Sequence, residues 1–197
     1  STVGQGNEEV CFKRTCSQTQ RSTHLKEMCS KYPELNITTS SNLSRLFVND
    51  KHKIMFCSLP KGGSTTFYNL FYYSITGKRL MDKHCLKCWN EVDLKFLHTF
   101  SPLEIEERLN SYYKVLVVRH PLDRLVSCWN DRFVHNLKSE LWVSHGPKLM
   151  NLYRNTSNSS QGASFQEFIS YITDINKLGL RDNTHWRPHY RMCHPCS

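Results

Sequence analysis

Two parts of the chain place a short apolar run directly before a turn and a helix-like pattern. Residues 54–57 and 114–118 are apolar runs of the length of a buried strand, and the second is rich in β-branched side chains. Apolar residues then recur at helical spacing from Phe67 to Gly77 and again over residues 122–133. The pattern therefore predicts the order strand, turn, helix twice.

Three further helices are predicted from their starts and their periodicity. A short helical pattern lies around residues 24–32. A capping box with Pro102 at the first helical position predicts a helix up to about Tyr112, and a second capping box at Ser164 predicts one through Asp174. Residues 139–163 are polar, and we expect them to form a loop.

Strands that alternate with helices predict an α/β protein. We expect a P-loop-like three-layer fold with a central, mainly parallel sheet, whose ligands bind at the carboxyl ends of the strands. Residues 1–45 are polar and rich in Ser and Thr, so we interpret them as a stem or peripheral arm, and residues 46–197 as a single domain. The apolar runs are far shorter than the roughly 18 to 20 residues that cross a bilayer. The chain begins with Ser and has no basic-then-apolar leader, so we expect any signal or anchor segment to have been removed or to lie outside this chain.

The composition is that of a folded, basic protein. Hydrophobic residues make up 39%, and 26 Lys and Arg face 17 Asp and Glu, for a formal net charge of +9. This balance suits anionic ligands. The positive charges are dispersed and no RNA-binding motif occurs, so we do not expect a nucleic-acid partner.

The cysteines and glycosylation sequons indicate an oxidising compartment. Nine cysteines and four sequons occur, the sequons at Asn36, Asn42, Asn155 and Asn158. We expect disulfides, with at least one cysteine unpaired because the number is odd. A zinc site remains an alternative, since residues 85–88 and 193–196 are both Cys-x-x-Cys pairs, although roughly a hundred residues separate them. Cys57 and Cys128 fall on apolar patterns and can also be small buried side chains.

The turn after the first predicted strand is suited to an anion. Two glycines follow Lys61, and Ser64, Thr65 and Thr66 come at the start of the predicted helix, where amides and hydroxyls are available. The lysine precedes both glycines, so this is not a Walker A loop and ATP hydrolysis is disfavoured. An ordinary glycine turn before a helix is the competing interpretation.

The second turn carries an arginine at the end of its strand. Arg119 stands beside Pro121, and Ser127 follows on the predicted helix. An arginine there is often a salt-bridge partner, but its planar fork also binds phosphate. Two anion-suited turns at one edge of a parallel sheet predict a ligand with two separated phosphate groups.

Three motifs together resemble one family. Residues 57–67 (CSLPKGGSTTF) look like the phosphosulfate-binding stretch of Golgi carbohydrate sulfotransferases, and residues 118–127 (VRHPLDRLVS) look like their 3′-phosphate-binding stretch. Residues 182–188 (DNTHWRP), followed by 193–196 (CHPC), are typical of the branch with the chondroitin, dermatan and N-acetylgalactosamine 4-O-sulfotransferases and the natural-killer-epitope glucuronyl 3-O-sulfotransferase. The resemblance covers about residues 43–196.

The resemblance implies transfer of a sulfuryl group from 3′-phosphoadenosine 5′-phosphosulfate to a sugar hydroxyl of an anionic or neutral glycan. It implies no metal, a location in the Golgi lumen as the lumenal part of a type II membrane protein, and a membrane anchor outside this chain. The residues implied for the donor are Pro60, Lys61, Gly62, Gly63, Ser64, Thr65, Thr66, Arg119, Arg124 and Ser127. Among them, Lys61 also serves catalysis, because it neutralises charge on the leaving phosphate. Arg132 lies on the same predicted helix as Arg124 and either contacts the ligands or faces solvent.

Two histidines are candidates for the base that takes the proton of the acceptor hydroxyl. His98 precedes Arg119 by an interval close to that of the base histidine in related sulfotransferases, and His185 lies within the third motif. Members of this family normally continue past the Cys-x-x-Cys element, so the resemblance implies that residues 46–197 lack the C-terminal part of the domain. Two alternatives stay open. One is a truncated, non-catalytic relative that binds a glycan or nucleotide, and the other is a zinc-stapled interaction module.

Overall fold

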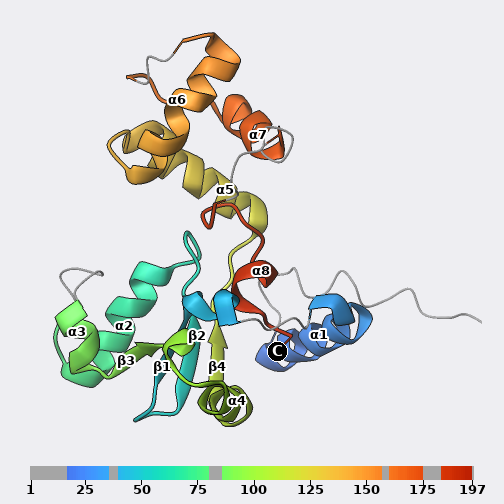
Figure 1. The fold of residues 1–197 in the computed structure, drawn as a ribbon, viewed down its shortest axis with the longest axis vertical. Coiled ribbons are helices and arrows are strands. Elements are labelled where there is room, and N and C mark those ends of the chain that lie inside the picture. Colours follow the sequence, from blue (N-terminus) through green and yellow to red (C-terminus); the bar gives the residue numbers. More distant parts are fainter. Residues whose placement is uncertain (1–16, 36–39, 80–85, 157–159, 175–182, 197) are drawn as a thin grey trace, which may run out of the picture.

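The computed structural model describes residues 17–35, 40–79, 86–156, 160–174 and 183–196. Figure 1 shows a small sheet with helices around it, and a group of helices that projects away from it. The helices are α1 (Gln18–Lys31), α2 (Ser64–Thr76), α3 (Leu86–Glu91), α4 (Pro102–Ser111), α5 (Pro121–Trp129), α6 (Glu140–Arg154), α7 (Phe165–Asp174) and α8 (Tyr190–Cys193). Shorter helical turns are η1 (Pro33–Leu35), η2 (Ser40–Arg45), η3 (Leu97–Thr99) and the π-helical η4 (Asn130–His135). The predicted helices over 102–112 and 164–174 are confirmed.

The sheet has the strand order β3-β1-β2-β4. Its strands are β1 (Leu46–Asn49), β2 (Ile54–Cys57), β3 (Leu94–Phe96) and β4 (Tyr113–Leu116). The α/β class is confirmed, but the predicted mainly parallel sheet is not found in the described residues: β1 pairs antiparallel with β2 and with β3, and only β2 and β4 are parallel. The reason is local, because the short turn between β1 and β2 makes a hairpin, and a hairpin is antiparallel.

The two faces of the sheet are covered by different helices, which agrees with a three-layer arrangement. Phe47 and Phe56 point to one face, stack with centroids 5.2 Å apart, and pack against Tyr68 and Tyr72 of α2. Residues of the opposite parity, including Val48 and Met55, form a second cluster with side chains of η3, α4 and α8. This double cover buries the central strands β1 and β2, whereas the edge strand β4, which was predicted to be buried, is exposed to half-buried.

The projecting helices have a core of their own. Phe133, Trp142, Phe168 and Tyr171 from η4, α6 and α7 are fully buried together. The prediction of a loop over 139–163 is wrong, because residues 140–154 form α6. Gly146 and Pro147 are helix-breaking residues in the middle of this segment and weaken its helical pattern. Burial of its apolar face compensates for them, and Gly146 gives the Trp142 ring room, since a Cβ there would lie 2.6 Å from it.

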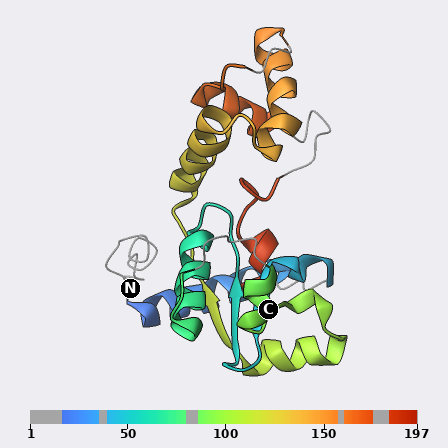
Figure 2. The same cartoon turned by 90° about the vertical axis from the view of Figure 1, so that its left-hand side faces the viewer.

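The C-terminal segment, residues 183–196, joins the two parts. Trp186 packs into the helical core, whereas Met192 and Cys193 pack into the sheet core. Figures 1 and 2 show this segment between the sheet and the projecting helices. Disulfides Cys57–Cys193 and Cys29–Cys196 tie it to β2 and to α1.

The cysteines confirm the predicted disulfides and contradict the zinc alternative for the pair at residues 193–196. Cys85 of the other Cys-x-x-Cys pair lies outside the described residues. Cys88, Cys193 and Cys196 are all disulfide-bonded, and in the described part of the chain no group of His, Cys, Asp and Glu could hold a metal ion. Cys57 is a buried half-cystine rather than a simple apolar residue. Cys128 is buried and free, which agrees with its place on an apolar pattern, and burial raises the pKa of its thiol to about 12.

The region predicted as an arm is only partly described. Helix α1 has no buried residue, whereas Leu43 of η2 is buried in the sheet core. Asn155 of the third sequon is exposed and ends α6. Asn36 and Asn158 lie outside the described residues, and for Asn42 only the backbone is described. Among the helices in the described ranges, none has the length and apolar character needed to cross a membrane.

Candidate active site

The turn between β2 and α2 exposes the amino end of a helix. Gly63 is the N-cap of α2 with φ +94°, and it has no side chain that could cap the helix. The first N–H groups of a helix have no intrahelical acceptor, and the helix dipole makes that end positive. Lys61 also adopts a left-handed conformation, with φ +63°. A lysine in this strained conformation beside free amides is the expected local geometry of an anion site.

The second turn leaves the same edge of the sheet. Cys57 is the register partner of Leu116 in the parallel pair β2 and β4, so both strands end at the same level. The turns also touch, because a Cβ on Gly62 would lie 3.3 Å from the carbonyl oxygen of Val117. Arg119 is exposed three residues after β4, and Ser127 is half-buried on α5. The two turns identified from sequence are therefore neighbours.

A cavity of about 780 Å³ opens beside the first turn. Side chains from the sheet part, from η4 and α6, and from the C-terminal segment line it together. The residues named from sequence that line it are Pro60, Lys61, Gly63, Ser64, Thr65, Arg132 and His185. Ser58, Asn183 and Thr184 also line it and lie within the quoted motifs, although no role was predicted for them. Arg45, Tyr68, Asp131 and Glu140 line it and were not identified from sequence.

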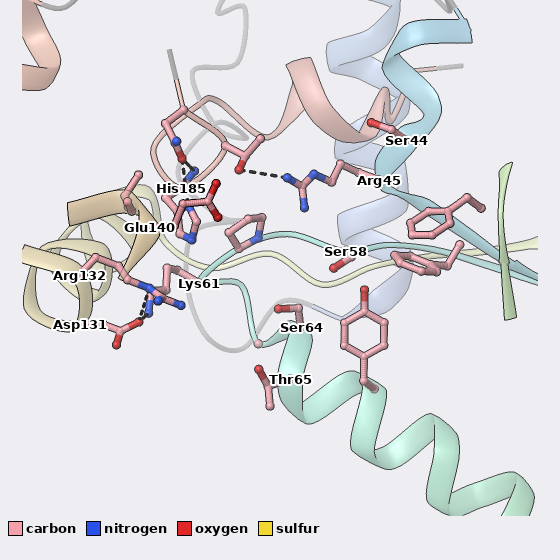
Figure 3. A pocket seen from close by; sticks show the side chains of 18 of the residues that line it. Ser44, Arg45, Ser58, Lys61, Ser64, Thr65, Asp131, Arg132, Glu140 and His185 are labelled. Carbon is pink, nitrogen blue, oxygen red and sulfur yellow. Dashed lines mark hydrogen bonds and ion pairs between the residues drawn. The ribbon is translucent and has the colours of Figure 1, made fainter. Parts of the chain in front are cut away.

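Lys61 is held at the cavity by an ion pair. Its Nζ bonds Oδ2 of Asp131, and the same oxygen lies 3.0 Å from Nε of Arg132 (Figure 3). The Lys61 side chain is only 16% exposed. Asp131 and Arg132 belong to the π-helical turn η4, a distortion that is frequent at functional sites. The result is a cluster of two cations that share one carboxylate.

His185 faces the same cavity in a defined tautomer. Oδ1 of Asn183 accepts from the backbone N–H of His185 at 3.0 Å and lies 2.9 Å from its Nδ1. Because this oxygen only accepts, Nδ1 carries the proton and Nε2 keeps its lone pair. Burial first, then the positive charges of Arg132 and Lys61, lower the pKa of His185 to about 4. Its ring is therefore neutral at physiological pH and can accept a proton.

The other predicted residues lie outside the cavity lining. His98 is exposed on η3, where its ring centroid lies 5.4 Å from that of Phe96, which does line the cavity. Thr66 is exposed on α2, next to the lining residue Thr65. Arg124 is buried beneath the turn, where its guanidinium donates to backbone carbonyl oxygens.

Arg45, Asp131 and Glu140 lie at the cavity but were not predicted to be there. Arg45 is the last residue of η2, and its Nη2 donates to Oγ1 of Thr184 at 3.2 Å. In the sequence, Asp131 is marked only by its position beside Arg132, just after the second motif. Arg45 and Glu140 lie in segments that we interpreted as an arm and as a loop.

Comparison with known proteins identifies the class to which this fold and this site belong. The model of the sulfotransferase family matches residues 44–197, so the chain belongs to that family. Several curated relatives then give a narrower resemblance. The chain is 32% identical over 192 residues to carbohydrate sulfotransferase 10 of Xenopus laevis, which covers 90% of this chain and 54% of the relative. It is 34% identical over 164 residues to the human protein of that name, covering 78% and 46%.

A second named relative is similar as well. Human carbohydrate sulfotransferase 9 is 30% identical over 198 residues, which covers 91% of this chain and 42% of the relative. The chain thus spans about half the length of the curated relatives it matches. No solved structure matches the chain. The family predicted from the three motifs is confirmed.

Proposed function

We propose that this chain carries the donor site of a carbohydrate sulfotransferase, which transfers a sulfuryl group from 3′-phosphoadenosine 5′-phosphosulfate to a sugar hydroxyl. One observation carries the proposal: Lys61, the amino end of α2 and His185 meet at one cavity of about 780 Å³. Names of similar proteins support carbohydrate as the acceptor. Within this proposal, the two strand–turn–helix units form the parallel part of a P-loop-like domain over residues 46–197, and residues 1–45 are its arm.

The donor is held at its two ends by the two turns. Lys61 and the amides and hydroxyls from Gly62 to Thr66 hold the 5′-phosphosulfate, and Pro60 sets the approach of the chain to this turn. Arg119 and Ser127 hold the 3′-phosphate. The shared edge of β2 and β4 supports this assignment, because it brings both anion-suited turns to one ligand.

The transfer itself moves one group and one proton. The oxygen of the sugar hydroxyl attacks the sulfur atom, and a new S–O bond forms as the bond between sulfur and the 5′-phosphate oxygen breaks. The phosphate leaves with that electron pair as adenosine 3′,5′-bisphosphate. Nε2 of His185 takes the proton of the hydroxyl, while Lys61 and the helix amides neutralise the charge on the leaving oxygen. The chemistry uses no metal ion, since fixed cationic groups meet the developing charge.

The acceptor is a glycan, anionic or neutral, that enters the cavity from the side of Arg45. Arg45 and Arg132 suit an acceptor with carboxylate or sulfate groups. Disulfides and sequons favour the Golgi lumen as the site of action, with an anchor outside this chain.

The test is transfer of radiolabelled sulfate to chondroitin, dermatan and glucuronyl-terminated glycans. We expect Lys61→Ala and Arg119→Ala each to lower turnover by about 10²- to 10³-fold, because each removes a charged group that contacts the donor. Lys78→Ala is the control, since Lys78 pairs with Glu91 at the far end of α2 and should leave turnover unchanged. Parental rates in both donor-site variants would overturn the proposal.

The non-catalytic alternative makes a different prediction. A relative that only binds ligands would release heat when adenosine 3′,5′-bisphosphate is titrated into it but would transfer no sulfate. Binding with turnover excludes it.

A further inference from the structure

Arg124 is a buried cation that contacts three separate backbone carbonyl groups. The residue is 4% exposed and lies on α5, just after the second turn. Its Nε donates to the carbonyl oxygen of Pro60 at 2.9 Å. Its Nη1 donates to that of Arg187 at 2.8 Å, and its Nη2 to that of Thr184 at 2.6 Å.

These three carbonyl groups belong to the two sides of the proposed reaction centre. Pro60 directly precedes Lys61, which contacts the donor in the proposed function. Thr184 and Arg187 flank His185, the proposed base. One guanidinium on α5 therefore holds the donor turn and the histidine segment at the same time.

We propose that Arg124 is a positioning residue, which sets Lys61 and His185 at a fixed separation through the carbonyl groups of Pro60, Thr184 and Arg187. The inference rests on the proposed function for its catalytic consequence, but the mechanical coupling of the two segments stands on the hydrogen bonds alone. In this role Arg124 acts on the reaction centre through backbone carbonyl groups and does not contact the donor.

The chemistry of arginine explains why this residue type is needed. A planar guanidinium directs its donors in fixed directions, and three acceptors in different segments require that fork. A lysine keeps the charge but has a single nitrogen, which cannot meet three separate acceptors with the same geometry. A buried cation without such partners is strongly unfavourable, so the three carbonyl groups also hold the charge in place.

In the described residues, a hydrogen bond and a disulfide also join the histidine segment to the sheet part. Arg45 bonds the side chain of Thr184, and the disulfide Cys57–Cys193 joins β2 to the end of the segment several residues away. Neither contact involves Pro60 or Arg187. Loss of the Arg124 fork should therefore loosen the turn and the histidine segment together.

The first experiment measures amide hydrogen exchange in the 197-residue chain and in Arg124→Lys. We expect exchange to rise at least about tenfold at hydrogen-bonded amides of both segments: those of Gly62 and Phe67 at the donor turn, and those of Trp186 and Arg187 in the histidine segment. Arg154→Lys is the matched control, because Arg154 also donates to two segments, to Glu167 and to the carbonyl oxygen of Gly162, but far from the cavity. It should raise exchange only in α6 and α7. Unchanged exchange in either of the two cavity segments of Arg124→Lys would overturn the proposal.

The second experiment separates positioning from a general loss of stability. Below the melting temperature of each variant, we expect Arg124→Lys to lower kcat about 10- to 100-fold, because a displacement near 1 Å between reacting groups has an effect of that order. The donor KM should change less than kcat, and the pH profile should keep its position, since the charge is retained. A loss that appears only in donor KM would instead mean that Arg124 contacts the donor, and it would overturn the proposal.

The coupling can still be tested if the variant does not fold or if the wild-type chain is inactive. If Arg124→Lys does not fold, exchange of the wild-type chain in rising sub-denaturing urea decides. The amides of Gly62 and Phe67 should lose protection together with those of Trp186 and Arg187, and loss at different urea concentrations overturns the coupling. If the wild-type chain neither binds adenosine 3′,5′-bisphosphate nor transfers sulfate, the proposed function fails, while the exchange result still decides whether Arg124 couples the two segments.

Discussion

At the scale of single residues, Asp131 and the proposed ligand compete for the same cation. Asp131 bonds Nζ of Lys61 and also lies beside Arg132, so its carboxylate neutralises the positive groups that an anionic donor needs. A like charge next to a bound anion is unfavourable. The pair thus keeps a partly buried lysine satisfied, at the expense of donor affinity.

We expect Asp131→Asn to tighten binding of adenosine 3′,5′-bisphosphate about fivefold, because removing one like charge near a surface site is worth on the order of 1 kcal/mol. Isothermal titration calorimetry measures the change. Glu106→Gln, which removes an exposed acid on α4, is the control and should leave the affinity unchanged. Weaker binding in Asp131→Asn would mean that the carboxylate orients Lys61 for the ligand.

The two histidine candidates differ in their surroundings, and their variants should differ in rate. His185→Gln should lower kcat by about 10²- to 10⁴-fold, the usual contribution of a general base, and His98→Gln should not. His185 lines the cavity and has its Nδ1 hydrogen bonded to Asn183, whereas His98 is exposed. The reverse order of rates would assign the base to His98.

The pH profile gives an independent check on His185. The base must be unprotonated, so activity is lost as pH falls through its pKa, which is about 4 in the free chain. Donor anions offset the charges of Arg132 and Lys61, which help to lower that pKa, and so they raise it in the complex. We expect the acid limb of kcat to lie at higher pH than that of kcat/KM. Coincident limbs would contradict this.

At the scale of elements, the start of α2 combines a left-handed glycine with an uncapped helix end. A Cβ on Gly63 would meet nothing within 4 Å, so a side chain would fit there. Glycine is favoured at this position because its φ is +94°. Gly77 ends the same helix with φ +69° and equally free surroundings. The two glycines have the same conformational role at opposite ends of one helix, but only Gly63 lies at the cavity.

Alanine substitutions at Gly63 and Gly77 distinguish backbone strain from a role in binding the ligand. Gly63→Ala and Gly77→Ala should each lower the free energy of unfolding by about 1–2 kcal/mol, because L-residues are strained in the left-handed region. Urea denaturation measures this. Only Gly63→Ala should also weaken bisphosphate binding, since relief of its strain moves the helix amides. Equal affinities in the two variants would argue against the amino end of α2 as the anion site.

At the scale of the whole molecule, the cavity exists because the C-terminal segment joins two separate cores. The segment anchors Trp186 in the helical core and Met192 in the sheet core, and its His185 and His189 are half-buried, as is His145 in α6. Burial lowers the pKa of His185 and His189 to about 4, and it lowers that of His145 as well. Nε2 of His189 is buried without a hydrogen-bond partner in the described structure, so its protonation is unfavourable.

These histidines make the fold sensitive to mild acid. Each has a pKa near 6.5 when unfolded and a lower one when folded, so the unfolded state binds more protons below that value. Above pH 6.5 these neutral histidines do not reduce the stability of the fold. As the pH falls toward 4, the free energy of unfolding decreases, because the unfolded state binds more protons. We expect the melting temperature to fall steeply between these values, and less steeply in a His185→Gln, His189→Gln double variant. Equal slopes would exclude these histidines as the cause.

The sequence predicted those parts whose signals are local. The strand at 54–57, the strand predicted at 114–118 and found at 113–116, the capped helices after Ser101 and Ser164, and the two turns all follow from periodicity, caps and turn chemistry within a few residues. The strands at 46–49 and 94–96 were missed: the first directly follows the segment interpreted as an arm, and the second has only three residues. The long helix α6 was missed because Gly146 and Pro147 oppose it locally, and tertiary burial overcomes that opposition.

By itself, then, the sequence determined the family, the α/β class and the residue types that suit a sulfate donor, because each depends on neighbouring residues. Only the tertiary structure decided that β1 and β3 make the sheet mixed, that Asp131 meets Lys61 across 70 positions, and that Arg124 holds Pro60 and Thr184 together. Such contacts arise from the packing of two cores against one C-terminal segment. No short-range pattern encodes which distant side chains that packing brings within reach.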